Sequence, residues 1–66
     1  MAFKFGDKVM MNRSGHEAWG VAEDNPKGME GEIIEVDPWG GFMDFRVRWA
    51  NGTTNSYEEA DLDKLD

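Results

Sequence analysis

The stretch FMDFRVRWANGTTNSY, residues 42–57, decides the fold. Its first nine residues alternate between two faces, which is typical of a β-strand with one buried side. The Asn-Gly pair that follows is a strong signal for a hairpin turn, and TTNSY predicts the returning strand. The stretch therefore predicts an antiparallel hairpin whose core face carries Met43, Phe45, Val47 and Trp49.

The register of this hairpin decides where Tyr57 lies. A two-residue turn would pair Trp49 with Thr54 and leave Tyr57 on the outer face. A three-residue loop, residues 50–52, with its glycine left-handed in a bulge, would pair Trp49 with Thr53 and turn Tyr57 toward the core. Because a one-residue slip moves a whole strand to its other face, the two registers are distinct, and we favour the bulge.

The rest of the chain predicts three further short strands. GDKVMMN at 6–12 and MEGEIIEVD at 29–37 form the first two, and glycines and prolines punctuate the chain between strands. The tail predicts a single turn at 59–62 and then a brief strand that buries Leu62 or Leu65. These elements define one all-β domain over residues 1–66.

The connections between these strands carry two further signals. In the second strand, Gly31 marks a bend or a close backbone approach, and Ile33 and Val36 can share a face only through a bulge or a sharp twist. Residues 13–28 hold three glycines and one proline without a helical stripe, so we expect a long loop there. A loop of this length in a compact domain is usually functional or disordered.

Composition restricts the function. The chain has 66 residues, no cysteine and one histidine, His16, so disulfides and thiolate metal sites are excluded and no cofactor is expected. The net charge of −7 argues against nucleic acid as a partner and favours encounter with a basic one. No apolar run reaches membrane-spanning length and the N-terminus lacks a signal-peptide core, so a cytoplasmic location is expected.

The chain resembles a known family of small β domains. The shared pattern is a glycine-led start, a Gly-x-hydrophobic strand, a V-x-W-x-N-G hairpin, an Asn-x-Tyr and a closing Asp-Leu. It resembles the SH3-like domain of Mind bomb and HERC-type ubiquitin ligases, and small bacterial SH3-like proteins of unknown function. The matching positions are Gly6, Val9, Gly31, Ile33, Val47, Trp49, Asn51, Gly52, Asn55, Tyr57, Asp61 and Leu62.

This resemblance implies a five-stranded SH3-like barrel with a long first loop. It also implies a domain that binds substrate or partner peptides and has no catalytic residues of its own. The sequence departs from the family pattern where Glu58, rather than a basic residue, follows Tyr57. The tryptophan-rich first loop of the family is reduced here to Trp19.

Loop aromatics supply the first candidate binding site. Trp19 lies in the long loop, and either anchors a ligand or folds back to plug one end of the barrel. Trp39 lies at a turn tip and either joins Trp19 and Phe42 in an aromatic pocket or packs beneath a loop. Acidic residues beside such a pocket would favour a cationic guest, and they are Glu23, Asp24 and Asp37.

Two other groups of side chains are weaker candidates. Arg46 and Arg48 face outward together and would either receive a carboxylate or phosphate or pair with acids across the sheet. Lys8 could join them in a basic cluster. His16 beside Glu17 has no nucleophile or second base nearby in the sequence, so catalysis is not expected.

These observations favour a non-catalytic protein- or peptide-binding module. It would hold a basic partner through loop aromatics and an acidic rim. The alternative is a small acidic inhibitor that mimics nucleic-acid charge in the groove of a basic enzyme, and its binding would weaken steeply with salt. The oligomeric state stays open, since an edge strand could pair with a second copy.

Overall fold

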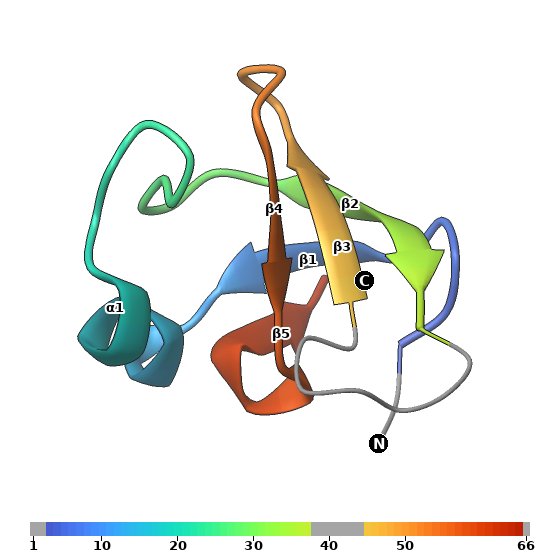
Figure 1. The fold of residues 1–66 in the computed structure, drawn as a ribbon, viewed down its shortest axis with the longest axis horizontal. Coiled ribbons are helices and arrows are strands. Elements are labelled where there is room, and N and C mark those ends of the chain that lie inside the picture. Colours follow the sequence, from blue (N-terminus) through green and yellow to red (C-terminus); the bar gives the residue numbers. More distant parts are fainter. Residues whose placement is uncertain (1–2, 38–44, 66) are drawn as a thin grey trace.

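The computed structural model describes residues 3–37 and 45–65. Five antiparallel strands form one sheet in the order β4-β3-β2-β1-β5, and a short helix, α1, leads from β1 toward β2 (Figure 1). A 3-10 turn, η1, precedes the last strand. The predicted all-β class with five strands is confirmed. The elements are β1 (Lys8–Met11), α1 (Arg13–Trp19), β2 (Gly31–Val36), β3 (Phe45–Trp49), β4 (Thr54–Tyr57), η1 (Glu59–Asp61) and β5 (Leu62–Lys64).

The β3–β4 hairpin has the bulged register that the sequence favours. Phe45 pairs with Tyr57, and the amide of Trp49 donates to the carbonyl of Thr53 at 2.8 Å. Gly52 closes the loop with a φ of +90°, a conformation that costs a side chain-bearing residue about 1–2 kcal/mol. Tyr57 therefore lies on the core side.

The β2–β3 pairing contains the irregularity expected in the second strand. Ile33 pairs with Val47, but Val36 pairs with Phe45, so the register shifts by one residue between Ile33 and Glu35. This bulge is what allows Ile33 and Val36 to face the same partner surface. The first part of the predicted third strand, 42–44, lies outside the described residues, and β3 is described from Phe45.

The core lies on one side of the sheet. Trp49 and Tyr57 are its largest fully buried members, and their rings meet edge to face at 5.7 Å. Gly31 lies against this pair: a Cβ there would stand 2.6 Å from the ring of Trp49, which confirms the predicted close approach. Of the two leucines in the tail, Leu62 is the buried one. The core comprises Val9, Met11, Ile33, Phe45, Val47, Trp49, Tyr57 and Leu62.

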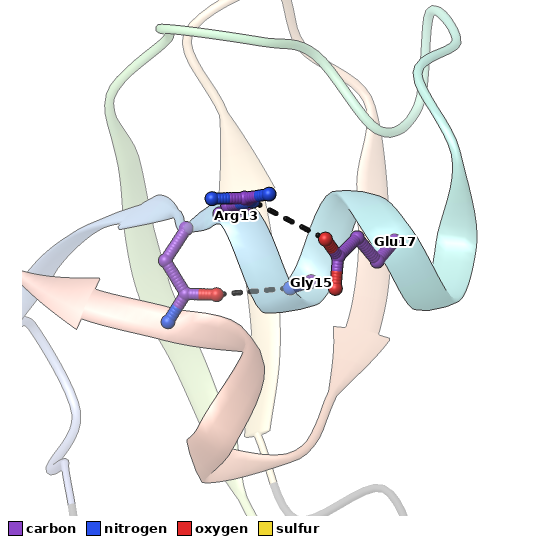
Figure 2. Close-up of polar contacts among 4 residues, drawn as sticks. Arg13, Gly15 and Glu17 are labelled. Carbon is purple, nitrogen blue, oxygen red and sulfur yellow. Dashed lines mark hydrogen bonds and ion pairs between the residues drawn. The ribbon is translucent and has the colours of Figure 1, made fainter.

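The predicted loop over 13–28 is wrong for its first part, which forms α1. Asn12 caps the helix, because its Oδ1 accepts from the amide of Gly15 at 2.9 Å. Arg13 and Glu17, one turn apart, form an ion pair at 3.2 Å. Figure 2 shows the Arg13–Glu17 pair and the capped amide of Gly15 on this one short helix.

Helix α1 lacks an apolar stripe because it packs through a glycine. A Cβ on Gly15 would stand 2.5 Å from the carbonyl oxygen of Asp61, so the helix lies directly against η1. Asn12 strengthens this contact: its amide donates to the same oxygen at 3.0 Å, and its side chain donates to Ala60 at 3.0 Å. Hydrophobic periodicity could not reveal a helix that packs in this way.

Candidate functional site

The chain between α1 and β2 forms a strap, which we define as residues 21–27. Within it, the amides and carbonyls of Ala22 and Asn25 bond to each other at 3.0 and 3.2 Å. This tight turn places Glu23 and Asp24 at its tip, and both residues are exposed. The strap therefore presents two adjacent carboxylates to solvent.

The strap is docked on the β3–β4 hairpin by its own backbone carbonyls. The carbonyl of Glu23 accepts from Asn51 Nδ2 at 2.8 Å and from Thr53 Oγ1 at 3.2 Å. The carbonyl of Asp24 accepts from the hydroxyl of Tyr57 at 2.9 Å. The carboxylate of Asp24 also lies 3.5 Å from Asn55 Nδ2, while the bonds from Asn51 and Thr53 reach Glu23 through its backbone carbonyl.

A buried polar network continues this docking inward. Trp49 Nε1 donates to the Tyr57 hydroxyl at 3.1 Å, and that hydroxyl also lies within hydrogen-bonding distance of Asn25 Oδ1. Asn55 Nδ2 donates to the same Asn25 oxygen at 3.1 Å. Asn25 Nδ2 donates in turn to the carbonyl of Trp19 at 3.3 Å. Asn25 thus links the strap, the helix end and the hairpin.

The environment of Tyr57 favours its neutral hydroxyl. Burial raises the pKa of this group, and the hydrogen bond from Trp49 opposes that shift. The carboxylates of Asp24 and Asp61 raise the pKa further, because a tyrosinate would be repelled by both. The negative charges of Asp24 and Asp61 therefore act on the buried hydroxyl of Tyr57.

Trp19 is both packed and accessible. Its Nε1 donates to Asp61 Oδ2 at 2.8 Å, and its ring meets that of Tyr57 edge to face at 6.5 Å. The residue nevertheless keeps 37% of its surface exposed. One edge of the indole is thus fixed against the fold, in line with the packed interpretation, and the exposed part leaves ligand binding by Trp19 as a prediction.

The proposed aromatic pocket can be followed only at Trp19, and the proposed acidic rim at Glu23, Asp24 and Asp37. Trp39 and Phe42 lie outside the described residues. Asp37 directly follows β2, and Figure 1 shows the end of β2 on the opposite side of the molecule from α1. Tyr57 contacts the Trp19 ring and the backbone carbonyl of Asp24, so Trp19 and the strap adjoin the same buried residue.

The two arginines lie on the outer face of the sheet. Arg48 approaches Glu32 at 3.7 Å, Lys8 approaches the same carboxylate oxygen at 3.6 Å, and Arg46 donates to Thr54 Oγ1 at 3.4 Å. The predicted pairing with second-strand glutamates is thus present. A shallow groove of about 260 Å³ opens here, lined by Lys8, Glu30, Gly31, Glu32, Arg48, Trp49, Ala50 and Gly52.

Sequence reasoning missed the side chains that hold the strap. Asn51, Asn55 and Tyr57 stand in the motif that indicates the hairpin, so their types were explained by the turn and the core alone. Their second role depends on the carbonyls of a segment about thirty positions away. A polar residue at every second position, 51 through 57, is the signal that could have indicated a docked segment on that face.

His16 and Glu17 do not form an acid–base pair. The Nδ1 of His16 lies 3.4 Å from the carbonyl of Gly20, while Glu17 is paired with Arg13. Across residues 3–37 and 45–65, no group of three or more potential metal ligands converges. Within the same part of the chain, no helix has the length and apolarity to cross a membrane.

Comparison with known proteins supports the fold. The chain is a small β protein of five antiparallel strands with one short helix. It is similar to the NMR structure of the Bacillus subtilis protein YorP, with a TM-score of 0.76 and 23% sequence identity over 100% of this chain and 73% of that one. At this identity the likeness shows the fold alone. No protein-family model and no curated protein matches the chain.

Proposed function

We propose that the chain is a non-catalytic protein- or peptide-binding module with an SH3-like barrel fold, as its hairpin motif suggests. In this proposal a basic partner binds the surface formed by Trp19 and the acidic strap tip, Glu23 and Asp24. The observation that carries it is that Tyr57 contacts both the ring of Trp19 and the backbone carbonyl of Asp24, while Trp19, Glu23 and Asp24 remain exposed.

The chemistry of this surface suits a lysine or arginine side chain. A cation over an exposed indole gains about 0.5–1 kcal/mol, and neighbouring carboxylates attract it over longer distances. Because the hydrogen bond from its Nε1 to Asp61 already holds the indole of Trp19, that side chain loses little freedom on binding. Val21, which is 62% exposed, adds an apolar contact beside the carboxylates.

The proposal is tested by capture from cell lysate with the tagged chain at low and high salt. Trp19→Ala should abolish retention of a specific basic protein at high salt. Phe5→Ala is the matched control, because Phe5 is 71% exposed and lies in the turn before β1. It should leave capture unchanged.

Variants that remove carboxylates distinguish the proposed binding module from the acidic inhibitor. Glu23→Gln with Asp24→Asn should weaken capture, whereas Glu30→Gln with Glu35→Gln, which removes the same charge from other exposed positions, should not. Capture that survives Trp19→Ala, responds equally to both double variants and vanishes with salt would favour the inhibitor. It would contradict the binding module.

A further inference from the structure

The strap has the contacts of a locally unstable unit. Val21, Ala22, Glu23, Asp24 and Lys27 are exposed, and only Asn25 and Pro26 are buried within it. Three of the hydrogen bonds that dock it, from Asn51, Thr53 and Asn55, have solvent-exposed atoms. Segments with few buried apolar contacts and exposed hydrogen bonds open at lower free energy than the core.

A glycine with positive φ stands at each end of the strap. Gly20 has a φ of +79° and Gly28 a φ of +71°. A Cβ at either position would meet nothing within 4 Å, so these glycines are not required for space. They are suited to absorb a backbone rotation, as hinge positions do.

We propose that residues 21–27 open as a unit about Gly20 and Gly28 while the five-stranded sheet stays folded. The polar side chains on the hairpin set how often the strap is docked. If the proposed function is correct, opening displaces the acidic strap tip from the binding surface, so a partner bound there holds the strap closed.

Trypsin cleavage at Lys27–Gly28 in the ligand-free chain measures this opening. Arg46 and Arg48 lie within β3, so cleavage after them requires unfolding of the sheet. We expect the initial rate at Lys27 to exceed the rates at these arginines. It should also depend weakly on urea, because strap opening exposes little surface.

A pair of threonine variants identifies the cause. Thr53→Val removes a hydroxyl that lies 3.2 Å from the carbonyl of Glu23 and 2.7 Å from Oδ1 of Asn51, whose Nδ2 itself donates to that carbonyl. The variant should raise the Lys27 cleavage rate about fivefold, the effect of one lost hydrogen bond. Thr54→Val is the matched control, because Thr54 is exposed on the hairpin and its hydroxyl accepts from Arg46. It should leave the rate unchanged.

Two results would overturn the proposal. Equal cleavage rates and equal urea dependence at Lys27 and at the two arginines would mean that the strap opens only when the whole sheet unfolds. A rate at Lys27 unaffected by Thr53→Val would mean that trypsin cleaves the docked strap. Because the assay contains no partner, its outcome is independent of whether a basic protein binds.

Discussion

At the scale of single residues, Tyr57 and Asn25 each combine burial with several hydrogen-bond partners. The Tyr57 hydroxyl receives a hydrogen bond from Trp49 and reaches both Asp24 and Asn25. Buried polar groups are stabilising when all partners are present and costly when one is removed. The stability of the docked state, in which the strap covers Tyr57, therefore depends on this network.

Tyr57→Phe tests this dependence. The variant keeps the buried ring but leaves Trp49 Nε1 and Asn25 Oδ1 each without one partner. We expect the free energy of unfolding in urea to fall by about 1–3 kcal/mol. Ser56→Ala, on the outward side of the same strand, is the control, and an equal small loss in both variants would contradict the network's role.

Gly15→Ala is a second test at this scale. In an ordinary helix interior the change stabilises by about 1 kcal/mol. Here the new Cβ would press on the carbonyl of Asp61, so we expect destabilisation of about 1–3 kcal/mol instead. Ser14→Ala on the same helix should have little effect. A more stable Gly15→Ala variant in thermal unfolding would show that α1 does not pack closely on η1.

At the scale of elements, the hairpin could be predicted because its information is local. The alternation from Phe45 to Trp49 marks the buried face of β3, and the Asn-Gly turn next to it marks where the chain reverses. Together they indicate the pairing of β3 with β4. Helix α1 could not be predicted, since its support is a cap from Asn12 and a glycine contact with distant η1. The strap falls within the loop predicted over 13–28, but its docking depends on long-range bonds to backbone carbonyls, which carry no sequence signal of their own.

The strap and hairpin together predict an alkaline transition. Tyr57 is the only tyrosine of the chain, so its ionisation can be followed by ultraviolet absorbance. Its pKa in the folded chain is raised from the usual 10.0, so the unfolded chain loses this proton first. The contribution of the neutral Tyr57 hydroxyl to the free energy of unfolding is complete below the unfolded pKa of 10.0. It is lost as the pH rises through the raised pKa of the folded chain.

The measurement is urea unfolding as a function of pH. The free energy of unfolding should fall with rising pH above about 10 in the wild type. Tyr57→Phe, which lacks the ionisable group, should lose that component of the slope. Identical slopes in the two proteins would contradict a buried neutral hydroxyl.

At the scale of the whole molecule, the outer sheet face and the strap differ in their charges, because the cations of the sheet face have carboxylate or hydroxyl partners there. Lys8, Arg46 and Arg48 lie on the outer face of the sheet, around Glu32. The adjacent carboxylates of Glu23 and Asp24 lie on the strap, which covers the core side of the hairpin. A net charge of −7 describes this molecule incompletely, because a basic partner would be directed to the strap rather than to the outer sheet face.

The most direct test of this account is selection of random peptides displayed on phage against the immobilised chain, with Trp19→Ala selected in parallel. We expect the wild type to enrich peptides that combine lysine or arginine with an apolar residue, and Trp19→Ala to lose them. Enrichment of the same peptides by both proteins, or no enrichment by the wild type, would contradict a ligand surface formed by Trp19 and the acidic strap.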